Sequence, residues 1–381
     1  ENRIQINIAY KFLTDSSAYI RSTTSQYPEI DIQPPRYVVS QVSTTNGIGG
    51  ENTKTYKYGG LKAHIKGRGN LGFEWIESTN KLTGIVSRTE YYQEFPYIGR
   101  PKRLTERLAN GTPIKEMTDN YAYTSPYDKV FFPYLQEGIK KSYELDGDLI
   151  ATEMTRNSEI DEYGNAQESE VRTEGGGEVF IKLTQNTYYN DTYNWFLGLL
   201  SNSQITYKGC GDTKTSFTSF EYDGRTGLLS KEIKEPYTDA KLITSYTYDN
   251  FGNRISVSMR GGGSDVRTLS TKYDFDGKFP VQITNPLGHT EIRKYDPKYG
   301  EVISLTDANG LITEWEYDSL GRKVKETRPD NTVTTWLYVW SDSSESGVSN
   351  TVYKITENTS GLPAVTTYYD AFARIVRNKT I

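Results

Sequence analysis

Residues 317–322 read Tyr-Asp-Ser-Leu-Gly-Arg, and residues 295–300 read Tyr-Asp-Pro-Lys-Tyr-Gly. Each stretch is a Tyr-Asp pair followed shortly by a glycine, after which a basic residue or asparagine often stands. The five members of this series are Tyr222-Asp223 with Gly227, Tyr248-Asp249 with Gly252, Tyr273-Asp274 with Gly277, Tyr295-Asp296 with Gly300, and Tyr317-Asp318 with Gly321. A phrase that returns in this way indicates a repeat protein, in which each copy is one small structural unit.

The copies follow one another at a short and nearly regular interval. Their tyrosines are 26, 25, 22 and 22 residues apart. Tyr338 comes 21 residues later with Val339 in the aspartate position, and Tyr369-Asp370 ends the series with Ala373 where glycine is expected. A polar insertion over residues 341–350 lengthens the last interval. We therefore expect the repeat structure to extend through the C-terminal part of the chain and beyond it.

The phrase encodes a tight turn. Asp296 can accept a backbone N–H at the first position of a type I turn, and Pro297 has the φ angle that the second position requires. Gly300 can take the positive φ angle at which the chain leaves the turn. The rest of this unit is predicted to form a strand, a second turn and a return strand, over residues 301–306, 307–310 and 311–317. Each unit is thus two strands and two turns.

Repeated hairpins must assemble, because a lone hairpin is marginally stable in water. Successive hairpins are expected to pair edge to edge in one growing sheet, and the inherent twist of sheets makes a long strip spiral. In the alternative, a β-propeller, two 22-residue units would form one four-stranded blade. A blade would show its signature once per four strands, whereas this signature recurs every 22 to 26 residues. The predicted fold is therefore all-β, a spiralling antiparallel strip of hairpins, with the β-propeller as the alternative.

The composition agrees with a sheet that has one face exposed to solvent. Tyrosine supplies 31 of the 381 residues, and aromatic residues favour strands, while hydrophobic residues make up only 35%. The 44 basic and 49 acidic residues are interspersed and give a net charge of −5, which excludes the basic stripe of a nucleic-acid-binding protein. A single cysteine, Cys210, excludes a disulfide framework.

The sequence predicts neither a membrane span nor a signal peptide in this chain. A spanning helix needs an apolar run of about 18 residues or more, and the chain has none. The opening residues Glu1, Asn2 and Arg3 do not begin a signal peptide, and the absence of an initiator methionine suggests a fragment of a longer protein.

The part of the chain before the repeats also reads as strands and turns. Residues 1–210 are predicted to be a β-rich region with degenerate repeats, and residues 211–381 the repeat region, the two being continuous as one β segment. Within the first region, Asn110-Gly111 predicts a hairpin. Residues 191–200 are expected to form either a short helix capped by Asp191 or a strand that enters the repeats.

One glycine motif needs separate treatment. Gly67, Gly69 and Gly72 have the G-x-G-x-x-G spacing of dinucleotide-binding loops, in which a helix must follow. The next residues, 73–77, read Phe-Glu-Trp-Ile-Glu and favour a strand. A glycine-rich bulge between strands is the favoured interpretation, and no cofactor is predicted.

No combination of residues points to catalysis or metal binding. His64 and His289 have no motif partners, and Cys210 in its Gly-Cys-Gly context is interpreted as a loop thiol. Neighbouring carboxylates could attract calcium, but the twelve-residue calcium loop is absent, so they are interpreted as turn formers. These pairs are Asp146 with Asp148, Asp274 with Asp276, and Asp307 with Asn309. The prediction is a protein without enzyme activity, in which the Tyr-Asp phrases are the structurally important sites.

The residues resemble the Rhs or YD-repeat family, which includes the B and C components of bacterial insecticidal-type toxin complexes, polymorphic toxins and teneurins. The five Tyr-Asp phrases carry this resemblance. The region before them is similar to the corresponding region of B-type components, and the likeness extends from about Tyr56. The matching stretches are Gly-Arg-Gly-Asn-Leu-Gly-Phe at 67–73, Gln-Glu-Phe-Pro-Tyr-Ile-Gly at 93–99, and Asn190-Asp191 with Trp195-Phe196-Leu197-Gly198.

The resemblance implies a hollow β-shell wound around an unfolded or inactive toxin segment. It also implies that the self-cleaving Rhs-associated core lies beyond Ile381 and that the docking and gating parts lie before Glu1. The expected partners are the remaining shell segments or a C-type component, its enclosed toxin domain and a translocation component, in a complex released from bacteria. The expected function is structural: a shell segment that encapsulates a toxin. The alternative is a cell-surface adhesion or carbohydrate-binding protein with aromatic side chains exposed on a rigid β-scaffold.

Overall fold

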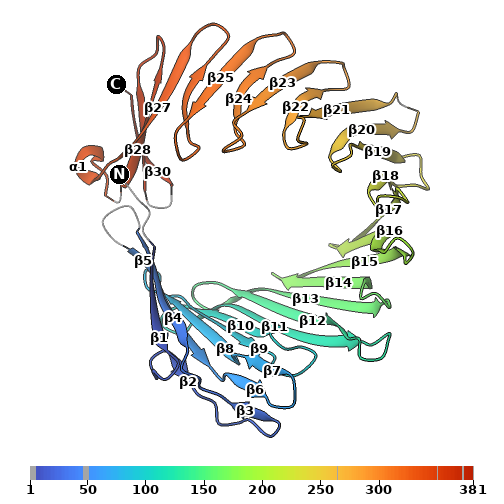
Figure 1. Ribbon diagram of the computed structural model, residues 1–381, viewed down its shortest axis with the longest axis vertical. Helices are drawn as coiled ribbons and strands as arrows, with labels where there is room; N and C mark the ends of the chain where they lie inside the picture. The colour runs from blue at the N-terminus through green and yellow to red at the C-terminus, as the bar shows by residue number, and fades with distance from the viewer. Residues whose placement is uncertain (1–5, 46–50, 264, 350, 371–372, 381) are drawn as a thin grey trace. The chain divides into compact units, whose positions relative to one another are not determined.

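The computed structural model describes residues 6–45, 51–263, 265–349, 351–370 and 373–380 (Figure 1). Residues 1–3, in which no signal peptide is expected, lie outside the described residues, as does Asn350 at the end of the insertion. Strands and the turns that join them make up nearly all of the described chain. The described residues divide into two compact units, one with residues 6–45 and 51–218 and the other with residues 219–380. The predicted all-β class is confirmed.

The first unit is a ribbon of antiparallel strands, each hydrogen-bonded to the next (Figure 1). In ribbon order the strands are β1 (Ile6–Phe12), β4 (Tyr37–Thr45), β5 (Glu51–Gly59), β8 (Trp75–Asn80), β9 (Val86–Tyr91), β10 (Pro101–Arg107), β11 (Pro113–Thr124), β12 (Phe132–Tyr143), β13 (Leu149–Ile160), β14 (Ala166–Gly175), β15 (Glu178–Asp191) and β16 (Phe196–Gly209). They lengthen from 6 residues in β9 to 14 residues in β15 and β16. Strand β17 (Asp212–Tyr222) contains the division between the units.

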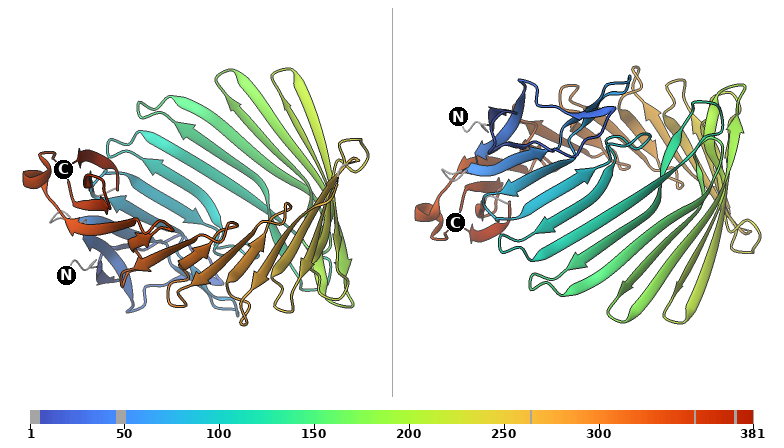
Figure 2. Two further views of the ribbon diagram at one scale, coloured as in Figure 1. Left: turned by 90° about the horizontal axis from the view of Figure 1, so that it is seen from above. Right: turned by 90° about the horizontal axis from the view of Figure 1, so that it is seen from below.

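A small second sheet and a hydrophobic core lie at the start of this ribbon. The strands of this sheet are β3 (Glu29–Asp31), β6 (Lys62–His64) and β7 (Gly69–Gly72), while β2 (Tyr19–Ile20) pairs in parallel with β5. Leu13, Tyr19 and Leu61 are almost fully buried there. The Tyr19 hydroxyl donates to the Ile32 carbonyl and accepts the Leu61 N–H, so the buried phenol is fully paired. Within the described residues, no second layer covers the long strands β11 to β16 (Figures 1 and 2).

The second unit is a ribbon of shorter antiparallel strands, again each paired with the next (Figure 2). They are β18 (Leu229–Lys234), β19 (Leu242–Tyr248), β20 (Arg254–Gly261), β21 (Arg267–Tyr273), β22 (Pro280–Thr284), β23 (Thr290–Tyr295), β24 (Val302–Thr306), β25 (Ile312–Tyr317), β26 (Lys323–Thr327), β27 (Val333–Trp340), β28 (Tyr353–Thr359), β29 (Val365–Tyr369) and β30 (Ile375–Thr380). The unit expected from residues 295–317 is present as a turn after β23, strand β24, a second turn and strand β25. Because pairing continues from strand to strand without a break every four strands, the antiparallel strip is confirmed and the β-propeller alternative is wrong.

The segment around Asp191 forms strands joined by a turn, not a helix. β15 ends at Asp191 and β16 begins at Phe196, so the helix alternative is wrong. The Asp191 carboxylate accepts the N–H groups of Tyr193 and Asn194, as a helix cap would. The chain nevertheless reverses, because Trp195 has a φ angle of 61°, a left-handed value at which a right-handed helix cannot continue.

Among the described residues there is one helix, α1 (Ser343–Ser346), which lies in the polar insertion and was not anticipated from the sequence. Asp342 caps it by accepting the N–H groups of Ser344 and Glu345, and Gly347 ends it in the left-handed conformation. An Asp-Ser-Ser-Glu stretch before a glycine is a capping signal that can be read from sequence.

The glycine motif near residue 70 is part of a hairpin. It lies in the turn between β6 and β7 and in β7 itself, and the next element is strand β8. Gly67, Gly69 and Gly72 all have positive φ angles, which explains why glycine occupies these positions. The prediction of a glycine-rich connection between strands is confirmed. The Asn110-Gly111 hairpin is also present, between β10 and β11, with Gly111 at a φ angle of 92°.

Candidate functional site

The repeat turns are built around the aspartate side chain. Asp318 Oδ1 accepts the backbone N–H groups of Leu320 and Arg322, both at 2.9 Å. The aspartates of the other phrases also accept backbone N–H groups from the turn that follows: Asp223 from Arg225 and Thr226, Asp249 from Phe251 and Asn253, Asp274 from Lys278 and Phe279, Asp296 from Lys298, and Asp370 from Arg374. The aspartate therefore holds the turn by satisfying backbone donors that the sheet leaves unpaired.

The backbone of these turns needs the glycine. The Gly321 N–H donates to the Asp318 carbonyl at 3.0 Å, and the Asp318 N–H donates to the Arg322 carbonyl at 2.9 Å. Gly321 has a φ angle of 74°, and the strand register shifts between Glu316 and Tyr317. This is a type I turn closed by a glycine bulge, a common three-residue hairpin connection. The turn expected from the Tyr-Asp phrase is thus observed.

In three turns, the side chain that follows the glycine position donates a hydrogen bond to the second carboxylate oxygen of the opening aspartate. Arg322 Nε donates to Asp318 Oδ2 at 2.7 Å, and Asn253 Nδ2 donates to Asp249 Oδ2 at 3.1 Å. In the last phrase, Arg374 donates to Asp370 at 2.7 Å although Ala373 replaces the glycine. Ala373 has a φ angle of 59°, so it adopts the glycine conformation despite its side chain. The arginine or asparagine therefore completes the turn in these three copies, whereas the side chain of Lys278 donates to Asp276 instead.

The tyrosine of the phrase ties its strand to the preceding one. Tyr248 donates its hydroxyl to the Leu229 carbonyl at 2.7 Å, Tyr295 to the Pro280 carbonyl at 3.2 Å, and Tyr317 to the Val302 carbonyl at 2.9 Å. Burial, with the charge of Glu301, raises the pKa of Tyr317, so its hydroxyl stays protonated as a donor at neutral pH. The sequence predicts tyrosine packing but not this hydrogen bond, since the acceptor is set by strand register.

Neighbouring turns also contact one another, which the sequence did not reveal. A side chain added at Gly277 would have its Cβ 2.6 Å from Phe251 Cδ2, so the phenyl ring of one turn covers the glycine of the next. Asn253 Nδ2 donates to the Gly277 carbonyl at 2.7 Å across the same junction. Between the copies that begin at Tyr295 and Tyr317, the Tyr299 hydroxyl donates to the Ser319 carbonyl at 2.7 Å. The residue before the glycine therefore links consecutive repeats.

Hydroxyl pairs across strands form a further repeated tie. The pairs in the second unit are Ser258 with Thr268, Thr284 with Thr290, Thr334 with Thr359, and Thr356 with Thr366, at 2.9 to 3.1 Å. Thr334 is fully buried, so its hydroxyl needs this partner. Alternating threonines in the sequence are a signal for such pairs, but only the register shows which residues meet.

The residues considered for chemistry are dispersed. His289 is exposed in the turn after β22, and His64 is partly buried in β6. Cys210 is a free, exposed thiol in the turn between β16 and β17. Asp146, Asp274 and Asp307 each accept a backbone N–H within their own turn, in agreement with the turn-former interpretation. Among the described residues, no group of three or more His, Cys, Asp or Glu side chains could hold a metal ion.

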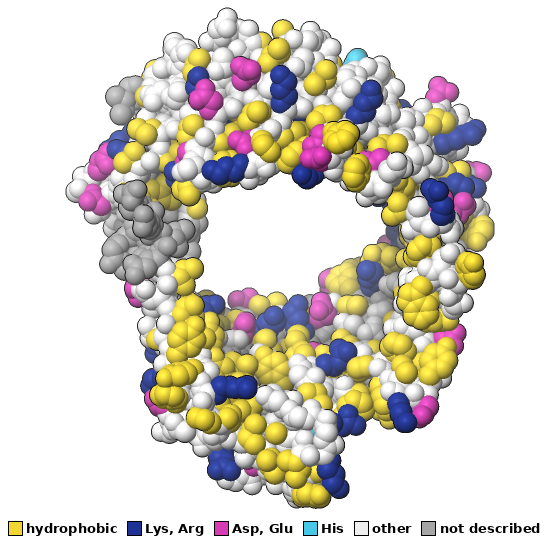
Figure 3. All heavy atoms as spheres, in the orientation of Figure 1, with side chains coloured by type: hydrophobic (Ala, Val, Ile, Leu, Met, Phe, Trp, Pro, Cys, Tyr) yellow, Lys and Arg dark blue, Asp and Glu magenta, His cyan; other side chains and the backbone are white. Residues whose placement is uncertain are grey.

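Charged surface groups of both signs are mixed, and some of them are paired. Figure 3 shows acidic and basic side chains scattered among apolar ones on the visible face. A polar hollow of about 420 Å³ over β11 to β14 illustrates the pairing, since Arg156 there donates to Glu137 at 2.8 Å and Ser158 donates to Glu168. No described helix has the length and apolar character required to cross a membrane.

Comparison with known proteins now identifies the repeat. Residues 295–333 match the family model described as RHS Repeat. This part of the chain is similar to the RHS repeat. No curated protein matches at the level of sequence.

The same fold occurs in solved toxin-complex structures. The crystal structure of TcdB2-TccC3 matches 98% of this chain with a TM-score of 0.62 and 11% identity. The form without its hypervariable C-terminal region matches 99% with a TM-score of 0.63 and 10% identity. The Photorhabdus luminescens Tc holotoxin pore matches 83% with a TM-score of 0.58 and 11% identity. These matches cover 28%, 30% and 23% of the respective chains, so this protein corresponds to under a third of each. The resemblance to Rhs-repeat toxin-complex components is confirmed for the fold.

Proposed function

We propose that this chain is a non-catalytic wall segment of an Rhs-repeat shell that encloses a toxin polypeptide and protects it for delivery. The observation that carries the proposal is that the strands form a ribbon a single layer thick. Among the described residues of the second unit, Val352 and Tyr368 are the only hydrophobic side chains classed as buried. Such a ribbon leaves both faces accessible, as a wall between an interior and solvent requires. The fold shared with TcdB2-TccC3 over nearly the whole chain supports the same role.

The proposed partners follow from this role. The ribbon would join further Rhs-repeat segments or a C-type component, enclose the toxin domain of that component, and work with a translocation component. The assembly would be released from the bacterium that makes it. The Tc holotoxin named among the structural matches supports association with other toxin-complex subunits.

Protease protection tests the proposal. The native gene product that carries this chain would be purified from its producing organism with its associated polypeptides and treated with protease. We expect a non-repeat segment to survive in the native assembly and to be digested once mild denaturant opens it. The variant Asp249→Ala, which removes one repeat turn, should speed this digestion, whereas Asp239→Asn in an exposed loop should not. Equal digestion of all segments in the native assembly would argue against encapsulation.

Carbohydrate binding is a second candidate, supported by one hairpin tip. Tyr193 and Trp195, in the turn between β15 and β16, are 95% and 74% exposed. Asp191 fixes this turn through two backbone hydrogen bonds, so the rings project from a rigid support. Aromatic faces held in this way can stack on sugars. A glycan array with the chain and its Trp195→Ala variant tests the idea, which fails if the two give the same signals.

A further inference from the structure

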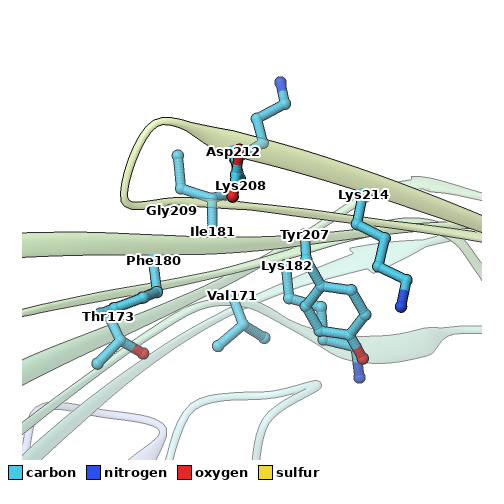
Figure 4. A pocket seen from close by; sticks show the side chains of 10 residues that line it. All are labelled: Val171, Thr173, Phe180, Ile181, Lys182, Tyr207, Lys208, Gly209, Asp212 and Lys214. Atoms are coloured by element: carbon cyan, nitrogen blue, oxygen red, sulfur yellow. The ribbon is translucent and has the colours of Figure 1, made fainter.

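A hollow of about 340 Å³ lies on one face of β14 to β17 in the first unit (Figure 4). Its apolar part is formed by Val171, Phe180 and Gly209, and its polar part by Lys182, Tyr207 and Lys214. Pockets that bind small molecules commonly have volumes of about 300 Å³ or more and combine an apolar lining with a few polar groups. The hollow therefore has the size and composition of a small-molecule site.

Strand register brings these side chains together. Val171 faces Lys182 across the β14 and β15 pair, and Lys182 in turn faces Tyr207 across the β15 and β16 pair. Thr173 and Phe180 form the next row on the same face, because side chains two residues apart share a face. Figure 4 shows these side chains pointing to one side of the sheet, while Ile181 and Lys208 point to the other.

Gly209 creates the hollow. A Cβ at this position would lie 2.5 Å from Phe180 Cδ1, so the phenyl ring leans over the bare glycine backbone instead of a side chain. Gly209 does not have a positive φ angle, so its backbone does not itself require glycine. Phe180 remains 47% exposed and Tyr207 50% exposed, which leaves a large apolar surface open to a ligand.

Positive charge surrounds this apolar surface. Neither Lys182 nor Lys214 forms an ion pair within 4.0 Å with any described residue. Asp212 adds a single negative charge to the lining. The lining of the hollow is therefore net positive, although the net charge of the chain is −5.

We propose that this hollow binds a small amphiphilic anion, such as a medium-chain carboxylate. Its apolar chain would lie over Phe180 and the backbone of Gly209, where burial of methylene groups is favourable. Its carboxylate would accept hydrogen bonds from Lys182, Lys214 and the Tyr207 hydroxyl, and bonds to charged donors are the stronger kind. Charge complementarity selects an anion over a cation with the same chain.

Calorimetric titration of the whole chain with three probes tests the site. Decanoate carries both chain and charge, butyrate carries the charge with a short chain, and decyltrimethylammonium carries the chain with the opposite charge. We expect decanoate to bind at least about tenfold more tightly than either of the others, since both apolar contact and charge contribute. Decanoate binding no tighter than decyltrimethylammonium binding would overturn the proposal.

Three variants locate the binding. Lys182→Gln should weaken decanoate binding about fivefold, as expected for one exposed charged contact. Lys57→Gln, at an exposed lysine of β5 that does not line the hollow, is the matched control and should leave binding unchanged. Gly209→Ala should weaken decanoate binding and leave the weak butyrate binding as it is, because the methyl group fills only the apolar part. Equal effects of Lys182→Gln and Lys57→Gln would overturn the proposal even if Gly209→Ala failed to fold.

Discussion

The turn at residues 161–165 in the first unit and the turn at residues 249–253 in the second have the same hydrogen bonds. In each, the opening aspartate accepts the N–H groups two and four residues later and the side-chain amide of the closing asparagine, at 2.8 to 3.1 Å. Ile160 precedes the first turn, whereas Tyr248 precedes the second and donates to the Leu229 carbonyl. The aspartate, glycine and asparagine therefore specify the turn, and the tyrosine adds a separate tie between strands.

Strand length explains where this tie matters most. Strands β13 and β14 pair at eight positions, whereas β22 and β23 pair at only three. Short ladders supply few backbone hydrogen bonds, so each repeat of the second unit depends more on its side-chain ties. The regular tyrosines accordingly occur where the strands are short.

The largest effect is expected at the junction between turns. Gly277→Ala should lower the free energy of unfolding of the second unit by about 2 kcal/mol, because it adds left-handed strain and displaces Phe251. Gly288→Ala is the matched control, since it has a similar φ angle but open space around it, and should cost about half as much. Denaturant titration measures both. In a Phe251→Ala background the two substitutions should cost the same, and a persistent difference would contradict the proposed contact.

The shared turn should respond equally in both units. Asp161→Ala and Asp249→Ala each remove the acceptor of two backbone N–H groups, and each should cost about 1.5 kcal/mol locally. Amide hydrogen exchange in the flanking strands measures this loss of local stability in each unit separately. A much smaller cost at Asp161 would show that the long strands, and not the aspartate, hold the first turn.

The tyrosine tie should matter only where it exists. Tyr248→Phe removes the hydroxyl donated to Leu229 and should cost about 1 kcal/mol, the usual net worth of one hydrogen bond. The faster exchange should appear in β18 and β19. Tyr193→Phe, at a side chain that is 95% exposed, is the control and should cost nothing measurable. Equal exchange rates in the two variants would show that the tyrosine hydroxyl does not stabilise the repeat.

The repeat turns could be predicted because their determinants lie within a few residues of one another. Asp318, Gly321 and Arg322 act on the same turn, so sequence order already places them together. The contact of Phe251 with Gly277 and the pair of Ser258 with Thr268 could not be predicted in the same way. They depend on which residues face each other across strands, and a shift of one residue would separate them.

The candidate binding hollow was missed for the same reason. Nothing near Gly209 in the sequence indicates that Phe180 lies over it, since that contact depends on the pairing of β15 with β16. The segment after Asp191 was ambiguous because a capping aspartate serves a hairpin turn as well as a helix. Only the left-handed conformation of Trp195 distinguishes the two.

Low pH should also destabilise the repeat turns, gradually and by less than the substitutions above. Hydrogen bonds from the side chain and backbone of Thr226 lower the pKa of Asp223 below its usual value of 3.8. A carboxylate with a lowered folded-state pKa stabilises the fold above its unfolded-state pKa, and this contribution is lost as the pH falls through the folded-state value. The denaturation midpoint of the second unit should therefore fall below about pH 4. Asp223→Asn should reduce that dependence, whereas Asp239→Asn, at an exposed aspartate that has no hydrogen bond to a described residue through its carboxylate, should not. An unchanged pH dependence in Asp223→Asn would mean that the turn is held by its backbone and not by the charge of its aspartate.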